Sequence, residues 1–244
     1  MRILLFLLIP LFIQAQDEDI PSKSAAHLFN LGIGIDQPVG QLADRFGRNN
    51  KISGGYNFLT SGDLLFGVDI SYYYGDNVKE DVLAPLRNAN GNIISTGELF
   101  SDVFGRQRGY YIGFEAGKIF SFKNKYRSGI KTTMGVGMLE HMIRIIDNDQ
   151  NSGKLFGERK KGYDRLTRGV ALRQYIGYHH LSVDQRINFT IGLEFTEGFT
   201  SSVRAVNWDT GLPGDTGRFD FIVGIKAVWM LPFWTGKSNE EIYY

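Results

Sequence analysis

Apolar and polar residues alternate with a period of two along most of the chain. The clearest case is the stretch INFTIGLEFTEGFT, whose odd positions are apolar and whose even positions are polar or small: Ile187, Phe189, Ile191, Leu193 and Phe195 against Asn188, Thr190, Gly192, Glu194 and Thr196. Such alternation predicts β-strands with one apolar face. Eight such segments occur, at about residues 27–36, 51–59, 64–76, 109–120, 129–146, 163–179, 187–200 and 218–233. Gln174 interrupts the apolar face of the sixth segment, so we expect a β-bulge there.

The connections between these segments alternate between long and short. The long ones cover residues 37–50, 77–108, 147–162 and 201–217, and the short ones cover residues 60–63, 121–128 and 181–186. Transmembrane barrels have short periplasmic turns and longer outer loops, and an even strand number returns both termini to the periplasm. A soluble barrel has no reason to confine its long loops to one end. We therefore predict an all-β fold over residues 27–234, an eight-stranded antiparallel up-and-down transmembrane β-barrel in the outer membrane of a Gram-negative bacterium.

Aromatic residues occur at both ends of the predicted strands. Those next to the long loops are Tyr72, Tyr73, Tyr74, Tyr110 and Phe219, and those next to the short turns or the end of the last strand are Phe58, Phe120, Tyr178, Trp229, Phe233 and Trp234. Transmembrane barrels carry aromatic girdles at both membrane interfaces. The distribution of aromatic residues therefore supports a membrane-spanning barrel over a soluble one.

The first 15 residues, MRILLFLLIPLFIQA, combine a basic start, a short apolar run and a small residue at the end, as in a secretory signal peptide. The apolar run is shorter than the roughly 20 residues of a spanning helix. We expect residues 16–26 to form a periplasmic linker and residues 235–244 to form a periplasmic tail. The chain has no cysteine, which excludes a lipoprotein anchor, disulfides and thiolate metal sites.

Basic and acidic residues balance in the predicted mature chain. The full sequence has 27 basic and 26 acidic residues, and removal of Arg2 leaves 26 of each. A neutral chain does not suggest a nucleic-acid partner. No motif in the sequence indicates a cofactor.

Charged residues also lie on the inward face of the predicted strands. An eight-stranded barrel has an interior only wide enough for side chains to fill, so inward charges must pair with one another to avoid a large desolvation cost. We expect three acidic and three basic residues to meet across the lumen: Asp69, Glu115 and Glu194 with Lys131, Arg173 and Lys226. A lumen filled in this way argues against an open pore.

The histidines give little indication of catalysis. Some outer-membrane lipid hydrolases and proteases use a histidine with serine or aspartate, and of the four histidines only His141 lies near the outer end, followed by Asp147, Asp149 and Ser152. We favour a hydrogen-bonded loop histidine over a catalytic pair. Residues 147–158 resemble a calcium loop, but the glycine is one place late and the flanks predict strands. We therefore assign no catalytic and no metal-binding residues.

Two outer loops carry candidate binding residues. Arg165 and Arg168 lie in the basic stretch GKLFGERKKGYDRLTR, which is either a solvated loop or a contact for phosphates of the outer-leaflet glycolipid, lipopolysaccharide. The loop of residues 77–108 is rich in apolar residues, so it either packs over the barrel mouth or docks on a protein partner.

The chain resembles an uncharacterised family of small outer-membrane β-barrels from Bacteroidota. The resemblance covers most of the mature chain and rests on five features: PVGQLADRFG, KKGYDRLTRG, ALRQYIGY, RINFTIGLEFTEGFT and the terminal YY. It implies fold and location but no active site, and barrels of that phylum often accompany envelope machines for protein export or barrel assembly.

Our leading hypothesis is a non-enzymatic accessory or anchoring barrel, with the tail of residues 235–244 or the loop of residues 77–108 as its docking segment. The alternatives are a lipid- or peptide-hydrolysing enzyme that uses the His141 region, and a narrow pore.

Overall fold

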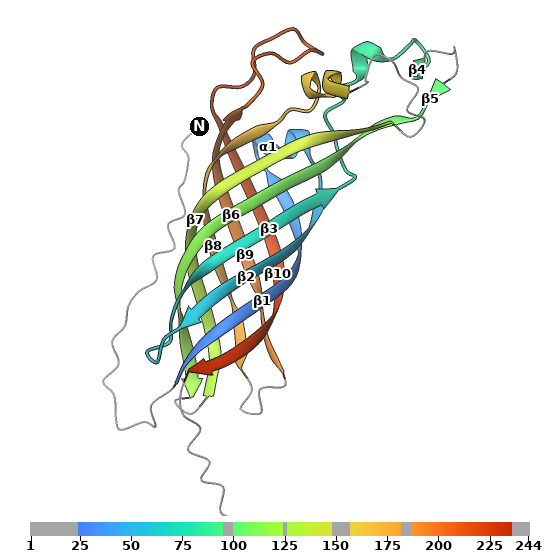
Figure 1. Cartoon of the computed structure of the whole chain (residues 1–244). Helices are drawn as coiled ribbons and strands as arrows, with labels where there is room; N and C mark the ends of the chain where they lie inside the picture. Colours follow the sequence, from blue (N-terminus) through green and yellow to red (C-terminus); the bar gives the residue numbers. More distant parts are fainter. Residues whose placement is uncertain (1–23, 95–99, 124–125, 148–156, 182–186, 236–244) are drawn as a thin grey trace, which may run out of the picture.

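The fold is a closed antiparallel barrel of eight strands (Figure 1). The computed structural model describes residues 24–94, 100–123, 126–147, 157–181 and 187–235. The barrel strands are β1 (Ala25–Val39), β2 (Asn49–Leu59), β3 (Leu64–Gly75), β6 (Val103–Lys123), β7 (Tyr126–Asp147), β8 (Thr167–Leu181), β9 (Asn188–Ser202) and β10 (Arg218–Thr235). Each strand pairs with its barrel neighbours along the chain, and β1 closes the ring against β10. The predicted eight-stranded up-and-down barrel is confirmed.

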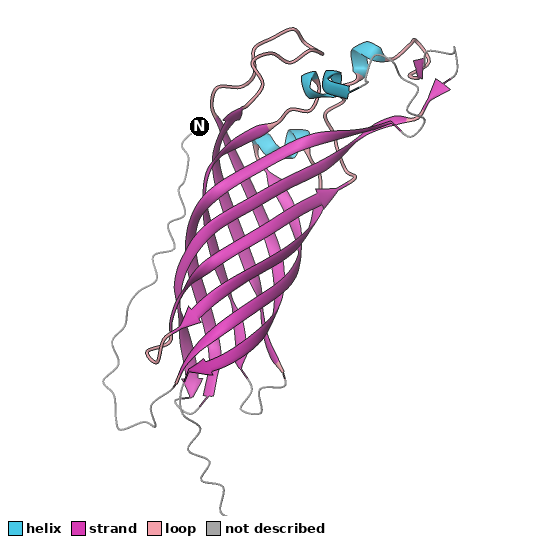
Figure 2. Cartoon of the chain, viewed as in Figure 1, coloured by secondary structure: helices cyan, strands magenta, loops and turns pink. Residues whose placement is uncertain are grey.

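Shorter elements gather at one end of the barrel, here called the loop end, and the opposite end is called the turn end (Figure 2). The loop-end elements are α1 (Gln41–Arg45), the 3-10 helices η1 (Ala84–Leu86) and η3 (Gly157–Gly162), and the small strands β4 (Ile93–Ile94) and β5 (Phe100–Ser101). None of the helices in the described ranges is long and apolar enough to cross a membrane.

β6 begins well before its predicted segment of residues 109–120, and β6 and β7 form a hairpin that extends past the barrel rim. Pairing between β3 and β6 ends at Gln107, and pairing between β7 and β8 ends at His141, but β6 and β7 remain paired up to Val103 and Asp147. Figure 1 shows this hairpin leaning outward at the loop end. The sequence hid the extension because glycine and charged residues replace apolar ones in FGRQRG.

The expected bulge at Gln174 is wrong. Its register partners Met134 on β7 and Phe195 on β9 continue without a shift on either side. Gln174 instead shares the outward face of the wall, where its Nε2 lies 3.5 Å from Glu197 Oε1. The amide of Gln174 thus meets the carboxylate of Glu197 on the same face, and the strand keeps its register.

The two faces of the sheet differ as the alternation predicts. Apolar side chains on the outward face are highly exposed, for example Leu31 at 61%, Ile112 at 56% and Phe114 at 72%. Aromatic contacts occur at both ends of this wall, between Tyr72 and Tyr110 at the loop end and between Phe29 and Phe233 at the turn end. An exposed apolar belt between aromatic girdles is the outer surface of a membrane-spanning barrel.

Two apolar layers close the inside of the barrel. The turn-end layer consists of Ala26, Leu28, Leu59, Leu65, Ile119, Leu181, Val228 and Met230. The loop-end layer combines strand residues with residues of α1 and of the loops: Leu42, Phe46, Tyr73, Val82, Leu83, Ile93, Val103, Tyr111, Leu139, Ile143, Ile145, Tyr163, Ala171 and Ile222. The loop of residues 77–108 thus packs its buried apolar side chains over the barrel mouth.

Candidate functional site

Between the two apolar layers, charged side chains from six strands meet at the centre of the lumen. Glu194 on β9 forms ion pairs with cations on three other strands: Lys51 Nζ at 2.6 Å, Lys226 Nζ at 3.1 Å and Arg173 Nε at 3.6 Å. Asp69 on β3 binds two of the same cations, with Arg173 Nη1 and Lys226 Nζ each at 2.6 Å. The glutamate on the polar, inward face of β9 is therefore the centre of an ionic cluster.

This lumen charge network comprises Asp36, Lys51, Asp69, Arg173, Glu194 and Lys226. Sequence reasoning missed Lys51 and Asp36, which lie 2.9 Å apart and extend the network to β1 and β2. Lys51 lies six residues before Asn57 in β2, so both side chains face inward, and this even spacing was the signal in the sequence. Glycine leaves room for the pair, because a Cβ at Gly224 would lie 1.8 Å from Asp36 Oδ1.

Glu115 and Lys131 lie beside this network without a direct ion pair to it. Glu115 accepts hydrogen bonds from Asn57 Nδ2 at 2.6 Å and Thr133 Oγ1 at 3.3 Å. Lys131 Nζ lies 5.8 Å from the centre of the Tyr175 ring. Both side chains line a small cavity of about 20 Å³, which is room for about one water molecule.

The lumen is electrically neutral as well as filled. The network together with Glu115 and Lys131 contains four acidic and four basic residues. Arg173 is held further by Tyr73, whose hydroxyl accepts a hydrogen bond from Nη2, and by the Tyr111 ring, whose centre is 3.4 Å from the guanidinium carbon. These contacts tie the charged centre to the loop-end layer.

His141 is part of the packed interior and is unsuited to catalysis. It lies in β7 rather than in a loop, and its Nε2 is 2.8 Å from Asp220 Oδ2. Thr200 Oγ1 donates to the same carboxylate at 2.5 Å, and the Phe46 ring packs edge-on against the imidazole. The histidine is 3% exposed, so a substrate has no access to it. The expected loop position of His141 is therefore wrong.

Other catalytic or metal-binding arrangements are weak. Ser128 Oγ lies 3.0 Å from His180 Nδ1 on the outward wall at the turn end, but within the described ranges no carboxylate pairs with His180. No group of three potential metal ligands occurs among the described residues. The calcium-like loop lies almost entirely outside them.

Four outer segments are joined by an ionic clasp, defined here as Arg45, Glu80, Arg165 and Asp209. Glu80 receives Arg45 Nε at 2.7 Å and Arg165 Nε at 2.6 Å. Arg165 also donates to both oxygens of Asp209, at 2.8 and 2.6 Å. Its φ of 49° is costly for a residue other than glycine. The clasp stabilises this conformation and links α1 to three loops.

The two arginines proposed to meet glycolipid phosphates have different positions. Arg165 is 7% exposed and its guanidinium is occupied by Glu80 and Asp209, so the expected phosphate contact does not fit this residue. Arg168 lies on the outward wall beside Glu140, and its side chain is 52% exposed. The phosphate contact therefore stays a prediction for Arg168 alone of these two arginines.

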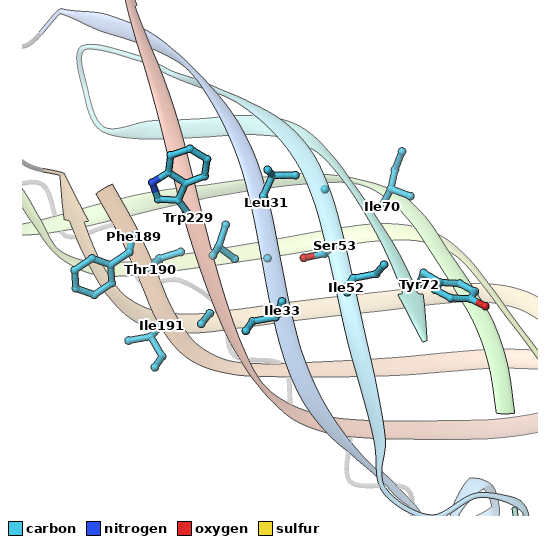
Figure 3. A pocket seen from close by; sticks show the side chains of 14 residues that line it. Leu31, Ile33, Ile52, Ser53, Ile70, Tyr72, Phe189, Thr190, Ile191 and Trp229 are labelled. Carbon is cyan, nitrogen blue, oxygen red and sulfur yellow. The ribbon is translucent and has the colours of Figure 1, made fainter. Parts of the chain in front are cut away.

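An apolar hollow of about 810 Å³ lies on the wall formed by β1, β2, β3, β9 and β10 (Figure 3). Small residues, Gly54 and Ala227, lie between larger ones such as Leu31, Ile33 and Trp229. This surface lies within the apolar belt, so acyl chains can pack into it, but its lining has no charged group that would select a ligand.

Replacing Glu194 by Leu should strongly destabilise the barrel, because Lys51, Arg173 and Lys226 would keep a buried excess of positive charge. We expect a loss of about 3–5 kcal/mol in the free energy of unfolding. Leu193→Ala, on the opposite and half-exposed face, should cost less. The measurement is denaturant unfolding from lipid vesicles, followed by the gel mobility of unboiled samples. Wild-type stability in Glu194→Leu would mean that water solvates the lumen charges.

The ionic clasp should open in acid. Burial alone would raise the pKa of Glu80, but the guanidiniums of Arg45 and Arg165 outweigh it and hold this pKa below its usual range. The clasp is therefore intact above the usual glutamate pKa of about 4.3 and is lost as the pH falls through the lower pKa of the folded state.

Trp208 reports on the clasp, because its backbone N–H binds Gly162 O and its ring packs on Tyr163. We expect Trp208 emission, obtained by difference from Trp208→Phe, to shift only below about pH 4. Glu80→Gln should produce the shift already at neutral pH, whereas Glu140→Gln should not. Equal spectra for the two glutamine variants would contradict the assignment.

No protein-family model and no curated protein matches this chain. Among solved structures, it is similar to Neisserial surface protein A, with 13% identity, coverage of 86% of this chain and 100% of that chain, and a TM-score of 0.47. It is also similar to the outer membrane protein OprG from Pseudomonas aeruginosa, with 10% identity, coverage of 89% and 100%, and a TM-score of 0.43. Ail, the attachment invasion locus protein of Yersinia pestis, is similar with 8% identity, coverage of 85% of this chain and 99% of that chain, and a TM-score of 0.43. Likenesses this distant carry no argument about function.

Proposed function

We propose that this chain is a non-enzymatic, non-conducting outer-membrane barrel that acts as an accessory or anchoring component of an envelope export or barrel-assembly complex. In this proposal it lies in the outer membrane of a Gram-negative bacterium, with both termini in the periplasm. The observation that carries the proposal is the sealed lumen, in which a neutral ionic centre lies between two apolar layers.

A sealed lumen argues against the pore alternative. An ion would have to displace the apolar turn-end layer, with Leu28, Leu59 and Leu65 all at most 1% exposed, and then pass side chains that already neutralise one another. Stripping water from an ion without replacing its contacts costs far more than thermal energy. The interior is thus suited to holding the barrel rigid, and function is left to its surfaces.

The surfaces also argue against the hydrolase alternative. His141 is buried on Asp220, and the Ser128–His180 contact has no carboxylate partner within the described ranges. The joined loops instead favour a fixed platform, because the ionic clasp holds four outer segments in one arrangement.

Of the two proposed docking segments, the tail is the better supported. Val82, Leu83 and Ile93 of the loop of residues 77–108 are each 2% exposed in the loop-end layer, so they are not available to a partner. Residues 236–244 of the tail lie outside the described residues. Their sequence GKSNEEIYY ends on apolar and aromatic residues, which are common anchors in peptide recognition.

The sealed lumen predicts the absence of single-channel conductance. The purified full chain, reconstituted in a planar lipid bilayer, should leave the current at its baseline under voltages at which a porin control conducts. Discrete current steps that scale with protein concentration would contradict a non-conducting barrel and would favour the pore alternative.

Deleting residues 238–244 should separate anchoring from folding. We expect the truncated barrel to insert and to keep the different gel mobilities of boiled and unboiled samples, but to lose proteins that co-purify with the full chain from native membranes. A matched control replaces the same seven residues by a glycine–serine segment of equal length. Retention of the partners by both variants would move docking to the outer loops, and failure to insert would make the tail part of the assembly signal.

A further inference from the structure

Four arginines share one outward-facing wall where β6, β7 and β8 leave the apolar belt at the loop end: Arg106, Arg108, Arg144 and Arg168. Even-numbered residues of these strands face away from the barrel axis, as the exposures of Tyr110 (52%), Met138 (43%) and Val170 (51%) indicate. Because side chains alternate along a strand, the four arginines lie on the same face as these residues.

The register brings Arg106, Arg108 and Arg144 close together and places Arg168 one strand further, nearer the apolar belt. Arg106 and Arg144 are direct cross-strand partners, and Arg108 lies one outward position nearer the belt, about 7 Å further along β6. Arg168 on β8 is the cross-strand partner of Glu140 on β7. Like charges that are directly opposite on one face of a sheet destabilise it, so the Arg106–Arg144 pair requires a compensating interaction.

The protein supplies only part of that compensation. Arg168 Nη2 lies 2.5 Å from Glu140, and Arg106 Nε lies 3.0 Å from Asp76, whose side chain is 76% exposed. Arg108 donates to the backbone oxygen of Gln107 at 2.6 Å. Arg144 is exposed and has no ion pair within the described part of the chain. Within the described part of the chain, two of the four arginines, Arg106 and Arg168, form an ion pair with a carboxylate.

The height of the cluster relative to the membrane is fixed by the tyrosines next to it. Tyr72 contacts both Tyr110, with ring centres 5.1 Å apart, and Tyr74, with ring centres 6.1 Å apart. Tyr74 is the register partner of Arg108. Aromatic belts lie at the level of the lipid headgroups, so the arginines lie at or just beyond the headgroups on the loop-end side.

We propose that Arg106, Arg108, Arg144 and Arg168 form a binding site for the phosphate groups of a phosphorylated glycolipid in the outer leaflet. A phosphate between Arg106 and Arg144 accepts paired hydrogen bonds from both guanidiniums and removes their mutual repulsion. A lipid-borne phosphate fits better than a soluble one, because the site faces sideways, directly above the apolar wall that would hold the acyl chains.

The test compares Arg106→Gln/Arg144→Gln with wild type in phosphatidylcholine nanodiscs that contain a phosphorylated lipid A or its dephosphorylated form. Bound lipid is counted by native mass spectrometry. We expect the double variant to bind phosphorylated lipid A at least about tenfold more weakly than wild type does. Lys79→Gln/Arg87→Gln removes the same charge from side chains bound to Ala43 O and Asp81 in the outer loops, and should bind like wild type.

Several outcomes would overturn the proposal. Equal binding by the double variant and wild type would mean that the arginines do not hold the lipid. If wild type bound the dephosphorylated lipid as tightly as phosphorylated lipid A, phosphate would not be the group that the site recognises. Displacement of the lipid by millimolar inorganic phosphate would identify a site for soluble anions instead.

Stability gives a second readout that a merely structural role would not reproduce. In nanodiscs of phosphatidylcholine alone, Arg144→Gln should unfold at the same or a higher temperature than wild type, because the substitution relieves repulsion. With phosphorylated lipid A present, the order should reverse. A lower unfolding temperature in both membranes would indicate an ordinary structural arginine and would count against the lipid site.

Discussion

The cancellation of charge inside the lumen is the interaction on which the rest of the structure depends. Cations and carboxylates from different strands neutralise one another around Glu194 and Asp69, away from bulk water. Isolated, each of these ions would carry a desolvation penalty of several kcal/mol. Because they are paired, the sheet can close tightly around them, and apolar layers can seal both ends.

The sealed interior separates the molecule into surfaces with different tasks. The apolar belt faces lipid, and the ionic clasp holds the outer segments together above the barrel mouth. The hairpin of β6 and β7 continues the wall beyond the rim, which carries the arginine cluster past the tyrosine belt. The positions of these features follow from strand length and register, so the barrel acts as a rigid frame for its rim.

The sequence predicted the strands well because each buries one face in lipid, which imposes a strict period of two. It failed where that rule weakens. Arg106 and Arg108 lie beyond the apolar belt, where outward positions turn polar, so the start of β6 was missed. Lys51 and Asp36 were missed because their partnership depends on a closed ring, and Arg165 was misplaced because the way a loop folds back is set by distant partners such as Glu80.

The ion pairs of the lumen also constrain how the barrel can assemble. Lys51 and Glu194 are 143 residues apart in sequence, and Asp69 and Lys226 are 157 apart, so neither pair can form within a hairpin of neighbouring strands. A half-built sheet in the bilayer would expose these charges to hydrocarbon, in addition to its unpaired edges. Insertion and ring closure must therefore occur together, and a partly inserted intermediate needs a sheltered, hydrated environment until β1 meets β10.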